Sequence, residues 1–323
     1  MKLILLALGT AVPLLMQSSP AVAQAPAFPK TVTLIVPFAP GASNDVFARM
    51  IAQELGPKLG STIVIENKPG AGASIGAHAL AKSPPNGGTF MLTSSTFTTH
   101  AGSSANVPYD PIKDFTPVAM IARAPLLVAV NNDTPFKSVA DLVKAAQTDK
   151  GAVNYGSSGT GSIPHLATEL FNEQIKGEMT HIPYKGISNV VTDLIGGRLQ
   201  LLIVSPPSIA GPVEAKRLRV LAVTSKEPSK FAPDLPTVSQ TVPGYNVSTW
   251  WGIFAPADTP PALVQRMNQE VLAIINTPDM QQRFAKEGAD AASAHSPADF
   301  AAHVKQEIEL WTRLSKERGI KAE

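Results

Sequence analysis

Apolar runs and stretches of helical periodicity alternate along most of the chain, and the first pair defines the pattern. The apolar and β-branched residues at 31–36 are typical of a buried strand. Pro40 and Gly41 end this run, and residues 43–45 are Ser, Asn and Asp, which are favoured at helix N-caps. Apolar residues from 46 to 55 then recur at helical spacing. This segment therefore predicts a strand, a tight loop and a helix over 43–55.

Two further strands are predicted in the first half of the chain, at 62–66 and 89–93, with a helix rich in small residues between them. This βαβαβ order predicts a parallel, doubly wound sheet. The next apolar run, 118–130, is long for one strand and is interrupted at 123–125 by Arg-Ala-Pro. We therefore place a crossing of the chain between two lobes near 123–125.

The pattern restarts at residue 152, with strands predicted at 152–155, 178–183 and 199–204. A loop rich in Gly and Ser, at 156–162, precedes a helix that begins near Pro164. Both halves of the chain then end on an extended run that leads through Thr-Pro into an amphipathic helix. This internal repeat predicts two doubly wound α/β lobes around a ligand cleft, joined by two crossings of the chain.

The expected domain boundaries follow from the two crossings, of which the second lies near 247–250. Lobe one comprises 28–122 and 249–323, and lobe two comprises 123–248. Apolar residues between Phe300 and Leu314 lie at helical spacing. We expect this C-terminal helix, over 298–321, to pack on lobe one.

Residues 1–23 have the pattern of a secretory signal peptide. Lys2 is followed by an apolar stretch at 3–16 and by Ala21-Val22-Ala23, a cleavage site of small residues. We expect cleavage after Ala23 and export of the mature chain, as a monomer, out of the cytoplasm. The sequence contains no cysteine, so neither disulfides nor thiolate metal sites contribute to its stability.

Composition and missing motifs argue against several classes of function. The 323 residues are 44% apolar and 16% charged, the balance of a folded globular protein. The formal net charge is +2 without a basic cluster, so we expect no nucleic-acid partner. The six histidines lack the paired spacing of metal ligands, and we expect neither a metal nor a cofactor. A Gly-x-Ser-x-Gly elbow, a complete dinucleotide loop and a Walker loop are missing, which argues against an enzyme.

The candidate site lies where the predicted strands end. Ligands of open α/β sheets bind at the carboxyl ends of the strands. The free N–H groups and the dipole at a helix N-terminus favour an anion there. We therefore expect two opposed loops to hold a small anionic solute as the lobes close about a hinge. The candidate ligand-binding residues are Phe38, Ala39, Gly41, Ala42, Ser43, Asn44, Ser94, Ser95, Ser157, Ser158, Gly159, Thr160, Gly161, Ser162, His165 and Ser205.

Some side chains near these loops allow two interpretations. Asp45 is suited to receive an ammonium group of a ligand, but an Asp at this position more often caps the helix. His165 and Lys185 are candidates either for contact with an anion or for a structural role. Trp250 and Trp251 could form an apolar wall of the site, whereas the burial expected of the second crossing favours core packing.

Many short motifs of the mature chain, taken in order, resemble those of one family. They include VPFAPG at 36–41, ENKPGAG at 66–72, YGSSGTGS at 155–162, PYKG at 183–186, DLIGG at 193–197 and WGIFAP at 251–256. In these motifs the chain is similar to the Bug (TctC-type) proteins, the periplasmic solute-binding receptors of tripartite tricarboxylate transporters. The resemblance implies a type II periplasmic-binding fold, a small organic carboxylate as ligand and membrane permease subunits as partners.

The resemblance also implies how the ligand is held. Family members hold one carboxylate between the two βα loops through backbone N–H groups and bridging waters. This chain departs from the pattern at Ala42, where a second glycine is usual, and at Asn189, where a proline is usual. The solute stays open among dicarboxylates, tricarboxylates, acidic amino acids and aromatic acids. Two alternatives also stay open: a receptor that presents its ligand to a membrane signalling protein, and an exported α/β enzyme.

Overall fold

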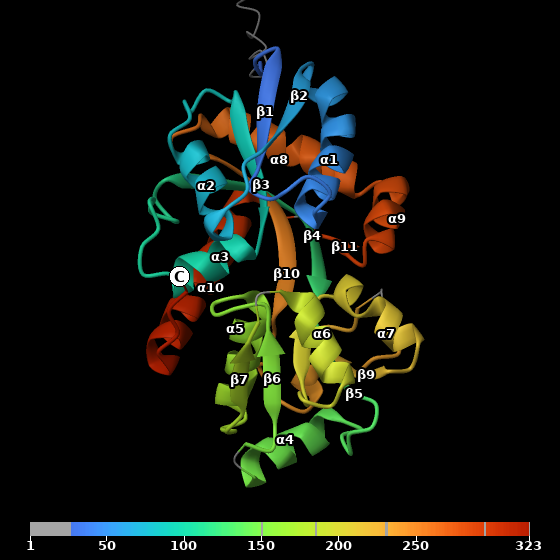
Figure 1. Cartoon of the computed structure of the whole chain (residues 1–323). Helices are drawn as coiled ribbons and strands as arrows, with labels where there is room; N and C mark the ends of the chain where they lie inside the picture. The colour runs from blue at the N-terminus through green and yellow to red at the C-terminus, as the bar shows by residue number, and fades with distance from the viewer. Residues whose placement is uncertain (1–26, 150, 185, 230–231, 294, 323) are drawn as a thin grey trace, which may run out of the picture.

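The computed structural model describes residues 27–149, 151–184, 186–229, 232–293 and 295–322. The expected signal peptide at 1–23 and Lys185 lie outside the described residues. The chain folds into two α/β lobes, one above the other in Figure 1, which are joined through the long strands β4 and β10. Within the described residues, no helix combines the length and the apolar character needed to cross a membrane.

Lobe one is built on a six-stranded sheet with the strand order β11-β4-β10-β3-β1-β2. Strands β1, β2 and β3 run parallel, and β10 is antiparallel to both of its neighbours. The elements of this lobe are β1 (Thr31–Val36), α1 (Ser43–Leu59), β2 (Thr62–Asn67), η1 (Ala71–Ala73), α2 (Ser74–Ala81), β3 (Thr89–Ser94), α3 (Thr96–Ser103), β4 (Phe115–Pro125), β10 (Ser248–Pro256), α8 (Pro261–Ile275), α9 (Pro278–Lys286), β11 (Asp290–Ala291) and α10 (Pro297–Arg318).

Apolar residues cover both faces of this sheet, because its strands are buried between two layers of helices. Helices α1, α8 and α9 pack on one face, where Phe47 and Trp251 lie in one core cluster. Helices α2, α3 and α10 pack on the other face, where Trp250 and Phe300 lie in a second cluster. Neighbouring residues of β10 therefore point to opposite faces, as the pleat of a strand requires.

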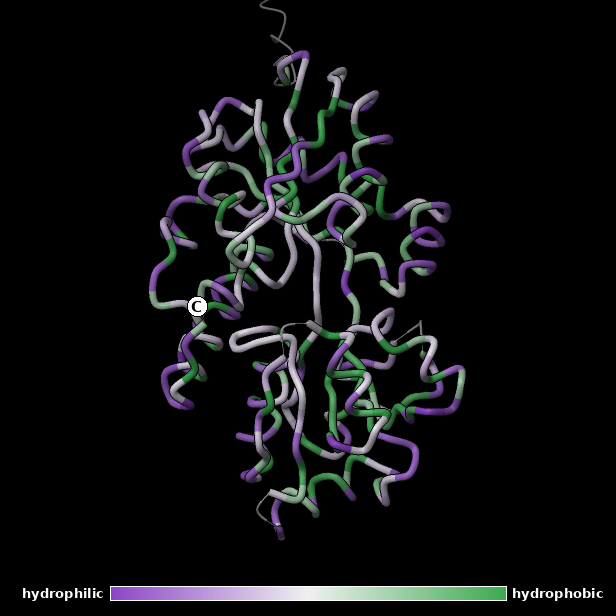
Figure 2. The backbone as a smooth tube through the Cα atoms, in the orientation of Figure 1, coloured by the Kyte–Doolittle hydropathy of each residue, from purple (hydrophilic) through white to green (hydrophobic). Residues whose placement is uncertain are grey.

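Lobe two has a smaller sheet made of two parts. Strands β8, β5 and β9 are antiparallel, β6 and β7 are parallel, and a bridge between Tyr155 and Leu201 joins the two parts. Figure 2 shows hydrophobic residues along the inner strands of this lobe and hydrophilic residues at its outer turns. The elements are β5 (Leu127–Asn131), α4 (Val139–Thr148), β6 (Asn154–Ser157), α5 (Ile163–Gln174), β7 (Thr180–Pro183), α6 (Ile187–Ile195), β8 (Leu202–Val204), η2 (Pro206–Ser208), α7 (Ala210–Glu214), β9 (Leu218–Val223) and η3 (Val238–Gln240).

The first crossing differs in detail from the prediction. Strand β4 continues through Arg123 and Ala124, which pair with Trp250 and Thr249, and the interruption falls instead at Leu126. The prediction of a break over 123–125 was therefore wrong by one to three residues. The pairing with β10 explains the difference, because a partner strand keeps Arg123 and Ala124 extended.

The C-terminal helix differs more from the prediction. It packs on α3 and β4 as expected, but Trp311 and Leu314 in its last turns belong to the apolar core of lobe two. Two ion pairs reinforce this contact, from Arg313 to Glu173 at 2.6 Å and from Arg318 Nε to Glu169 at 2.5 Å. Helix α10 therefore connects the two lobes in addition to covering lobe one.

Candidate functional site

The two loops predicted to hold the ligand have the same backbone conformation. Gly41 and Gly161 both lie in the left-handed region, with φ of 80° and 77°. The next residues are extended N-caps, with φ −69° and ψ 159° at Ala42 and φ −68° and ψ 158° at Ser162. A side chain at either glycine would be strained, so the chain places glycine at both positions.

The hydrogen bonds inside the two loops also correspond. Ala42 N donates to Ala39 O at 3.2 Å in lobe one, and Ser162 N donates to Gly159 O at 3.2 Å in lobe two. The glycine N–H then donates to the side chain four residues further on. In lobe one the acceptor of the Gly41 N–H is Asp45 Oδ2, at 2.9 Å. In lobe two the acceptor of the Gly161 N–H is His165 Nδ1, at 3.1 Å.

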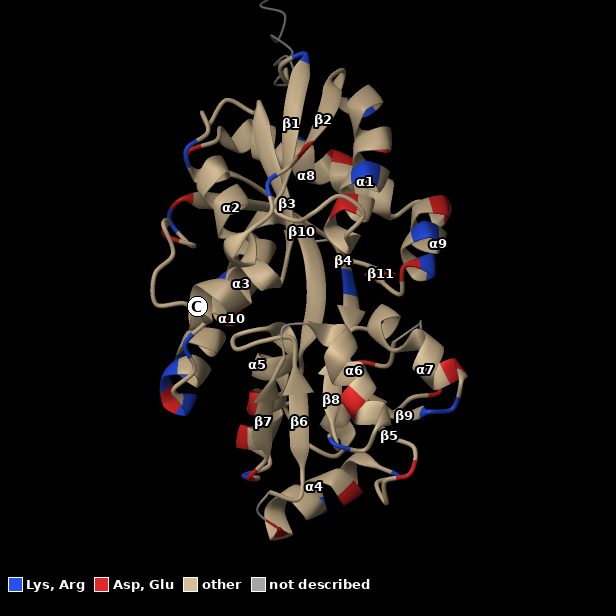
Figure 3. Cartoon of the chain, in the orientation of Figure 1, with Lys and Arg blue, Asp and Glu red and all other residues tan. Residues whose placement is uncertain are grey.

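Both loops lie at the edge of their lobe that faces the other lobe (Figure 1). The first-turn N–H groups of α1, from Ser43 to Asp45, have no acceptor within the helix. In α5 the corresponding donors are Ile163 and His165, because Pro164 has no N–H. The loop at 157–162 carries no charged side chain, as Figure 3 shows. Backbone N–H groups and hydroxyls are therefore its donors to an anion.

The loop of lobe one is held from behind by charged and polar side chains. Asp45 is buried and accepts two hydrogen bonds from Arg49, at 2.9 and 3.0 Å. Asn67 at the end of β2 donates to Asp45 Oδ1 and to Phe38 O, both at 3.0 Å. The hydrogen bond from Arg49, with those from Gly41 and Asn67, lowers the pKa of the Asp45 carboxyl to about 2.

These contacts assign Asp45 to the structure of the loop rather than to an ammonium group. Asn67 and Arg49 are not among the site residues predicted from the sequence. Asn67 carried a signal, since it lies at the end of a predicted strand and inside the ENKPGAG motif. Its contact with Asp45 is tertiary and cannot be inferred from spacing.

Two residues of the lobe-one loop remain available to a ligand. Ser43 is exposed, and its N–H lies in the first turn of α1. Asn44 is 4% exposed, and its Oδ1 has no hydrogen-bond partner among the described residues. An unpaired buried acceptor is unfavourable unless water or a ligand donates to it. Asn44 is thus the side chain of this loop with an unfilled hydrogen-bonding capacity.

In lobe two, the hydroxyls divide into two groups. Ser157 is buried and bonds to His181 Nε2 at 2.7 Å and to Gly159 O at 3.0 Å. Ser162 Oγ donates to Gly159 O at 2.6 Å. These two hydroxyls build the loop. Among the described residues, the hydroxyls of Ser158, which is half-buried, and Thr160, which is exposed, have no hydrogen-bond partner.

His165 is also part of the support of the loop. Its ring stacks on His181 with 3.7 Å between the centroids and 10° between the planes. Burial, followed by the charge of His181, lowers the pKa of His165 to about 3. The neutral ring can therefore accept the Gly161 N–H on Nδ1. Nδ1 of His165 therefore has a structural role, because it accepts the Gly161 N–H and is not free to contact a ligand.

A cavity of about 550 Å³ lies beside the loop of lobe two, between α5 and the end of α10. Thr160, His165 and His181 line it together with Glu169 and Arg318. Glu169 accepts hydrogen bonds from the Tyr155 hydroxyl and from Arg318 Nε. The C-terminal helix thus touches the support of the ligand loop, a relationship that the sequence analysis did not anticipate.

The hydroxyls of Ser94, Ser95 and Ser205 each lie within hydrogen-bond distance of another hydroxyl. Ser94 Oγ donates to Thr96 Oγ1 at 3.2 Å, and Ser205 Oγ lies 3.1 Å from Ser208 Oγ. The Ser95 hydroxyl lies 3.0 Å from Thr249 Oγ1, and this contact connects the end of β3 to the crossing strand β10.

The tryptophans follow the core interpretation: Trp250 is 1% and Trp251 7% exposed. Trp251 packs on Phe47 with 4.5 Å between ring centroids. Trp250 lies on the other face of the sheet, against Phe300 at 5.3 Å. Among the residues that the structure describes, no group of three or more His, Asp or Glu side chains is placed to hold a metal ion.

Comparisons with known proteins identify the family of this chain. The family described as "Tripartite tricarboxylate transporter family receptor" matches residues 47–320. Protein BugT of Bordetella pertussis is 32% identical over 90% of this chain and 90% of its own. A protein encoded in the tcbD-tcbE intergenic region of Pseudomonas sp. (strain P51) is 35% identical over 92% of this chain and 89% of its own.

Two solved structures of similar chains carry a ligand in their description. One, from R. palustris, is described with adipate; it is 36% identical, has a TM-score of 0.74, and the match covers 91% of this chain and 99% of that one. MatC from Rhodopseudomonas palustris, with bound malate, is 28% identical with a TM-score of 0.71 over 89% of this chain and 99% of its own. The fold class predicted from the sequence is confirmed. The chain belongs to the family of tripartite tricarboxylate transporter receptors.

Proposed function

We propose that this protein is a periplasmic receptor that binds a small organic carboxylate between the loop at 38–44 and the loop at 157–162. The carboxylate lies between the N-termini of α1 and α5, where backbone N–H groups and helix dipoles favour a negative charge. Ser43, Asn44, Ser158 and Thr160 complete the first contacts. Ser157, Ser162 and His165 support the loop at 157–162.

One observation carries this proposal: the same anion-binding loop occurs twice, once in each lobe. Gly41 and Gly161 share their conformation, their following N-cap and their hydrogen bond to the side chain four residues on. Two such helix termini facing one solute make a site whose donors are fixed before the ligand arrives. Fixed donors lower the ordering cost of binding.

The class of ligand is supported by the solved relatives and by the composition of the loops. Adipate and malate, the ligands of two similar structures, are both dicarboxylates. The loops at 38–44 and 157–162 contain no arginine or lysine. Recognition then depends on N–H groups, hydroxyls and bridging waters, which suit one carboxylate well and leave the far end of the ligand less constrained.

A thermal-shift titration of residues 24–323 tests the proposal. Adipate, malate, citrate, glutamate and benzoate are compared, with dimethyl adipate as the uncharged control. A ligand that binds only the folded state raises the melting temperature once its concentration exceeds the Kd. We expect a rise with at least one of the acids and none with the ester. If no acid raises the melting temperature of protein refolded free of ligand, the proposal is wrong.

Export and delivery complete the proposed function. The signal peptide at 1–23 directs the protein to the periplasm, and the loaded receptor docks on the membrane subunits of a tripartite tricarboxylate transporter. N-terminal sequencing of protein recovered from the periplasm is expected to start at Gln24. Uptake of the identified acid by cells should fall when this receptor is deleted and return when it is restored.

A further inference from the structure

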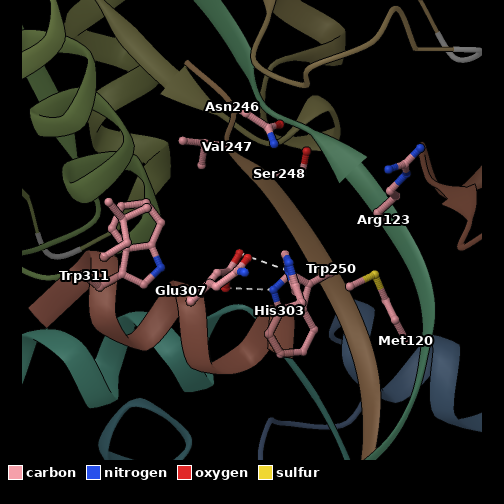
Figure 4. A pocket seen from close by; sticks show the side chains of 11 residues that line it. Met120, Arg123, Asn246, Val247, Ser248, Trp250, His303, Glu307 and Trp311 are labelled. Carbon is pink, nitrogen blue, oxygen red and sulfur yellow. Dashed lines mark hydrogen bonds and ion pairs between the residues drawn. The ribbon is translucent and has the colours of Figure 1, made fainter. Parts of the chain in front are cut away.

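A cavity of about 350 Å³ lies between α10 and the crossing strands β4 and β10, on the α10 face of the lobe-one sheet (Figure 4). Trp250 lines it, and the adjacent Trp251 points to the opposite face of β10. None of its lining residues belongs to the loops at 38–44 and 157–162. Its polar lining comprises Arg123, Asn246 and Ser248 from the crossing segments and His303, Gln306, Glu307 and Trp311 from α10.

At one end of the cavity, Trp311 carries an unused donor. The side chain is 2% exposed, and its Nε1 has no hydrogen-bond partner among the described residues. Figure 4 shows the indole nitrogen directed toward the middle of the cavity. A buried N–H without an acceptor is unfavourable, and burying it at a cavity wall leaves room for an acceptor to be supplied from outside the chain.

At the other end, Arg123 carries an unused positive charge. It is exposed on β4, opposite Trp250, and the structure gives its guanidinium no ion pair within the described residues. Glu307, in contrast, already accepts hydrogen bonds from Trp250 Nε1 at 2.9 Å and from Thr98 Oγ1 at 2.7 Å. A planar guanidinium with free N–H groups is suited to bind a carboxylate through two bonds.

The other charges around Arg123 limit what can bind. His303 Nε2 lies 3.4 Å from Glu307 Oε1. Lys226, Glu227 and Asp290 line an adjoining cavity of about 130 Å³ that also includes Arg123. The acidic side chains disfavour a ligand that is anionic throughout, so the negative charge of the ligand is expected at the Arg123 end alone.

We propose that this cavity is a second ligand site for an organic carboxylate with an apolar body and a neutral acceptor at its far end. The carboxylate pairs with Arg123, and the apolar body lies along Trp250, Met120 and Leu310, which line the cavity between the two ends. The neutral acceptor receives the Trp311 indole N–H. The site is independent of the proposed function, because it shares no residue with the paired loops.

The proposal is tested with 4-acetylbenzoate, followed by the indole N–H resonance of Trp311 in 15N spectra of residues 24–323. We expect this resonance to move downfield to saturation as the acetyl oxygen accepts the N–H. 4-Ethylbenzoate, which lacks the neutral acceptor, should bind without that downfield movement. 4-Methylacetophenone, which lacks the carboxylate, should bind at least tenfold more weakly.

Matched variants distinguish this site from the paired loops. Arg123→Gln removes the charge from an exposed side chain and should weaken 4-acetylbenzoate at least tenfold, at an unchanged melting temperature. Arg217→Gln, at another exposed arginine, should leave the Kd unchanged. Either of two results overturns the proposal: a Trp311 resonance that does not move, or a Kd that Arg123→Gln does not change. Resonance changes confined to 157–165 would place the probe in the loop site and also overturn it.

Discussion

The N–H of Gly161 donates to Nδ1 of His165 at 3.1 Å, in the position where the N–H of Gly41 donates to the carboxylate of Asp45. The two loops thus share one architecture but differ in charge. Asp45 places a negative charge in the first turn of α1, which offsets the positive end of that helix. The side chain of its partner Arg49 is 56% exposed, so solvent screens the positive charge that would otherwise balance the charge of Asp45. Because His165 is neutral, we expect the N-terminus of α5 to be the stronger of the two proposed anion sites.

The surroundings of the two glycines predict different effects of the same substitution. A left-handed alanine costs about 1–2 kcal/mol at either position. A Cβ at Gly41 meets nothing within 4 Å, whereas one at Gly161 comes within 2.6 Å of Ser103 Oγ and of Ala322 Cβ. Gly161→Ala should therefore lower the free energy of unfolding by more than Gly41→Ala does. Urea denaturation of both variants measures the difference.

Equal losses would show that the loop at 157–162 does not press against α3 and the C-terminal segment. The same contact decides how larger changes are interpreted. Gly161→Leu looks like a test of ligand binding, but it also disturbs the packing against Ser103. Loss of binding in that variant would be no proof that the loop holds the ligand.

His165 predicts a loss of stability in mild acid. Its pKa is about 3 in the folded protein and about 6.5 in an unfolded chain. As the pH falls, the unfolded chain therefore takes up a proton before the folded protein does. The contribution of neutral His165 to the free energy of unfolding is fully present above pH 6.5 and is lost progressively from there toward pH 3. His165→Gln keeps an acceptor for the Gly161 N–H and cannot titrate. We expect its melting temperature to change less than that of the wild type between pH 6.5 and 4.

Asp45→Asn provides the control for that measurement. The Asp45 carboxyl has a pKa of about 2 against a usual value of 3.8, so its contribution is complete above 3.8 and is lost between 3.8 and about 2. Asp45→Asn should leave the slope of stability between pH 6.5 and 4 as in the wild type. A wild-type slope in His165→Gln would contradict the assignment of this window to His165.

The sequence predicted most of the fold because local signals and tertiary structure agree there. Strand β1 occupies 31–36 as predicted, since its apolar run is bounded by turn residues. Helix α1 extends to Leu59, beyond the predicted end at 55, because Pro57 is accommodated and Gly60 supplies the left-handed cap. In lobe two, β6 lies two residues later than the predicted 152–155, and β7 and β8 are shorter than the predicted 178–183 and 199–204, since apolar character does not show where pairing with a neighbour begins or ends.

The site was predictable only to the level of its loops. Glycine and polar residues mark where a strand turns into a helix, so both loops were found, but the N-cap of α1 is Ala42 and not one of the favoured residues at 43–45. Ser157 and Ser162 support the loop, whereas Ser158 is available to a ligand. This difference depends partly on His181, which bonds to the Ser157 hydroxyl from another strand. The position of Trp311 in lobe two depends on the path of α10 across both lobes. Neither relationship leaves a periodic signal in the sequence.

The hydroxyls of lobe two predict a separation of binding from stability. The Ser158 hydroxyl has no partner among the described residues, whereas Ser162 Oγ donates to Gly159 O at 2.6 Å. Ser158→Ala should weaken binding of adipate by at least about tenfold, because a hydrogen bond to a charged group is worth roughly 1.5–3 kcal/mol and each 1.4 kcal/mol is about tenfold in Kd. Its free energy of unfolding should stay within about 0.5 kcal/mol of the wild type. Calorimetric titration and urea denaturation measure the two quantities.

Ser162→Ala is the matched control. The loss of an internal hydrogen bond should lower the free energy of unfolding by about 0.5–1.5 kcal/mol. If Ser158→Ala binds adipate as the wild type does while adipate binds the wild type well, the direct contact of Ser158 with the ligand is wrong. The paired-loop site would then depend on backbone N–H groups alone.

The last turns of α10 predict unequal effects for two arginines. Arg318 pairs with Glu169, whose side chain is 9% exposed, and Arg313 pairs with Glu173, whose side chain is 31% exposed. Arg318→Gln leaves a buried carboxylate with the Tyr155 hydroxyl as its remaining partner. Removing one member of a buried pair costs about 3–5 kcal/mol. Because Arg318 itself is 35% exposed, we expect a smaller loss, about 1–3 kcal/mol.

Arg313→Gln should lower the free energy of unfolding by less than about 1 kcal/mol, since its partners Glu173 and Glu317 are both accessible to solvent. Urea denaturation gives both free energies, and hydrogen exchange gives the local stability of the last turn of α10. Arg318→Gln should accelerate exchange in that turn and in the loop at 157–165, because Glu169 and His165 line the same cavity. Equal losses in the two variants, with exchange unchanged at 157–165, would separate the C-terminal helix from the support of the ligand loop. The predicted coupling would instead make the end of α10 a determinant of how firmly lobe two presents its anion site.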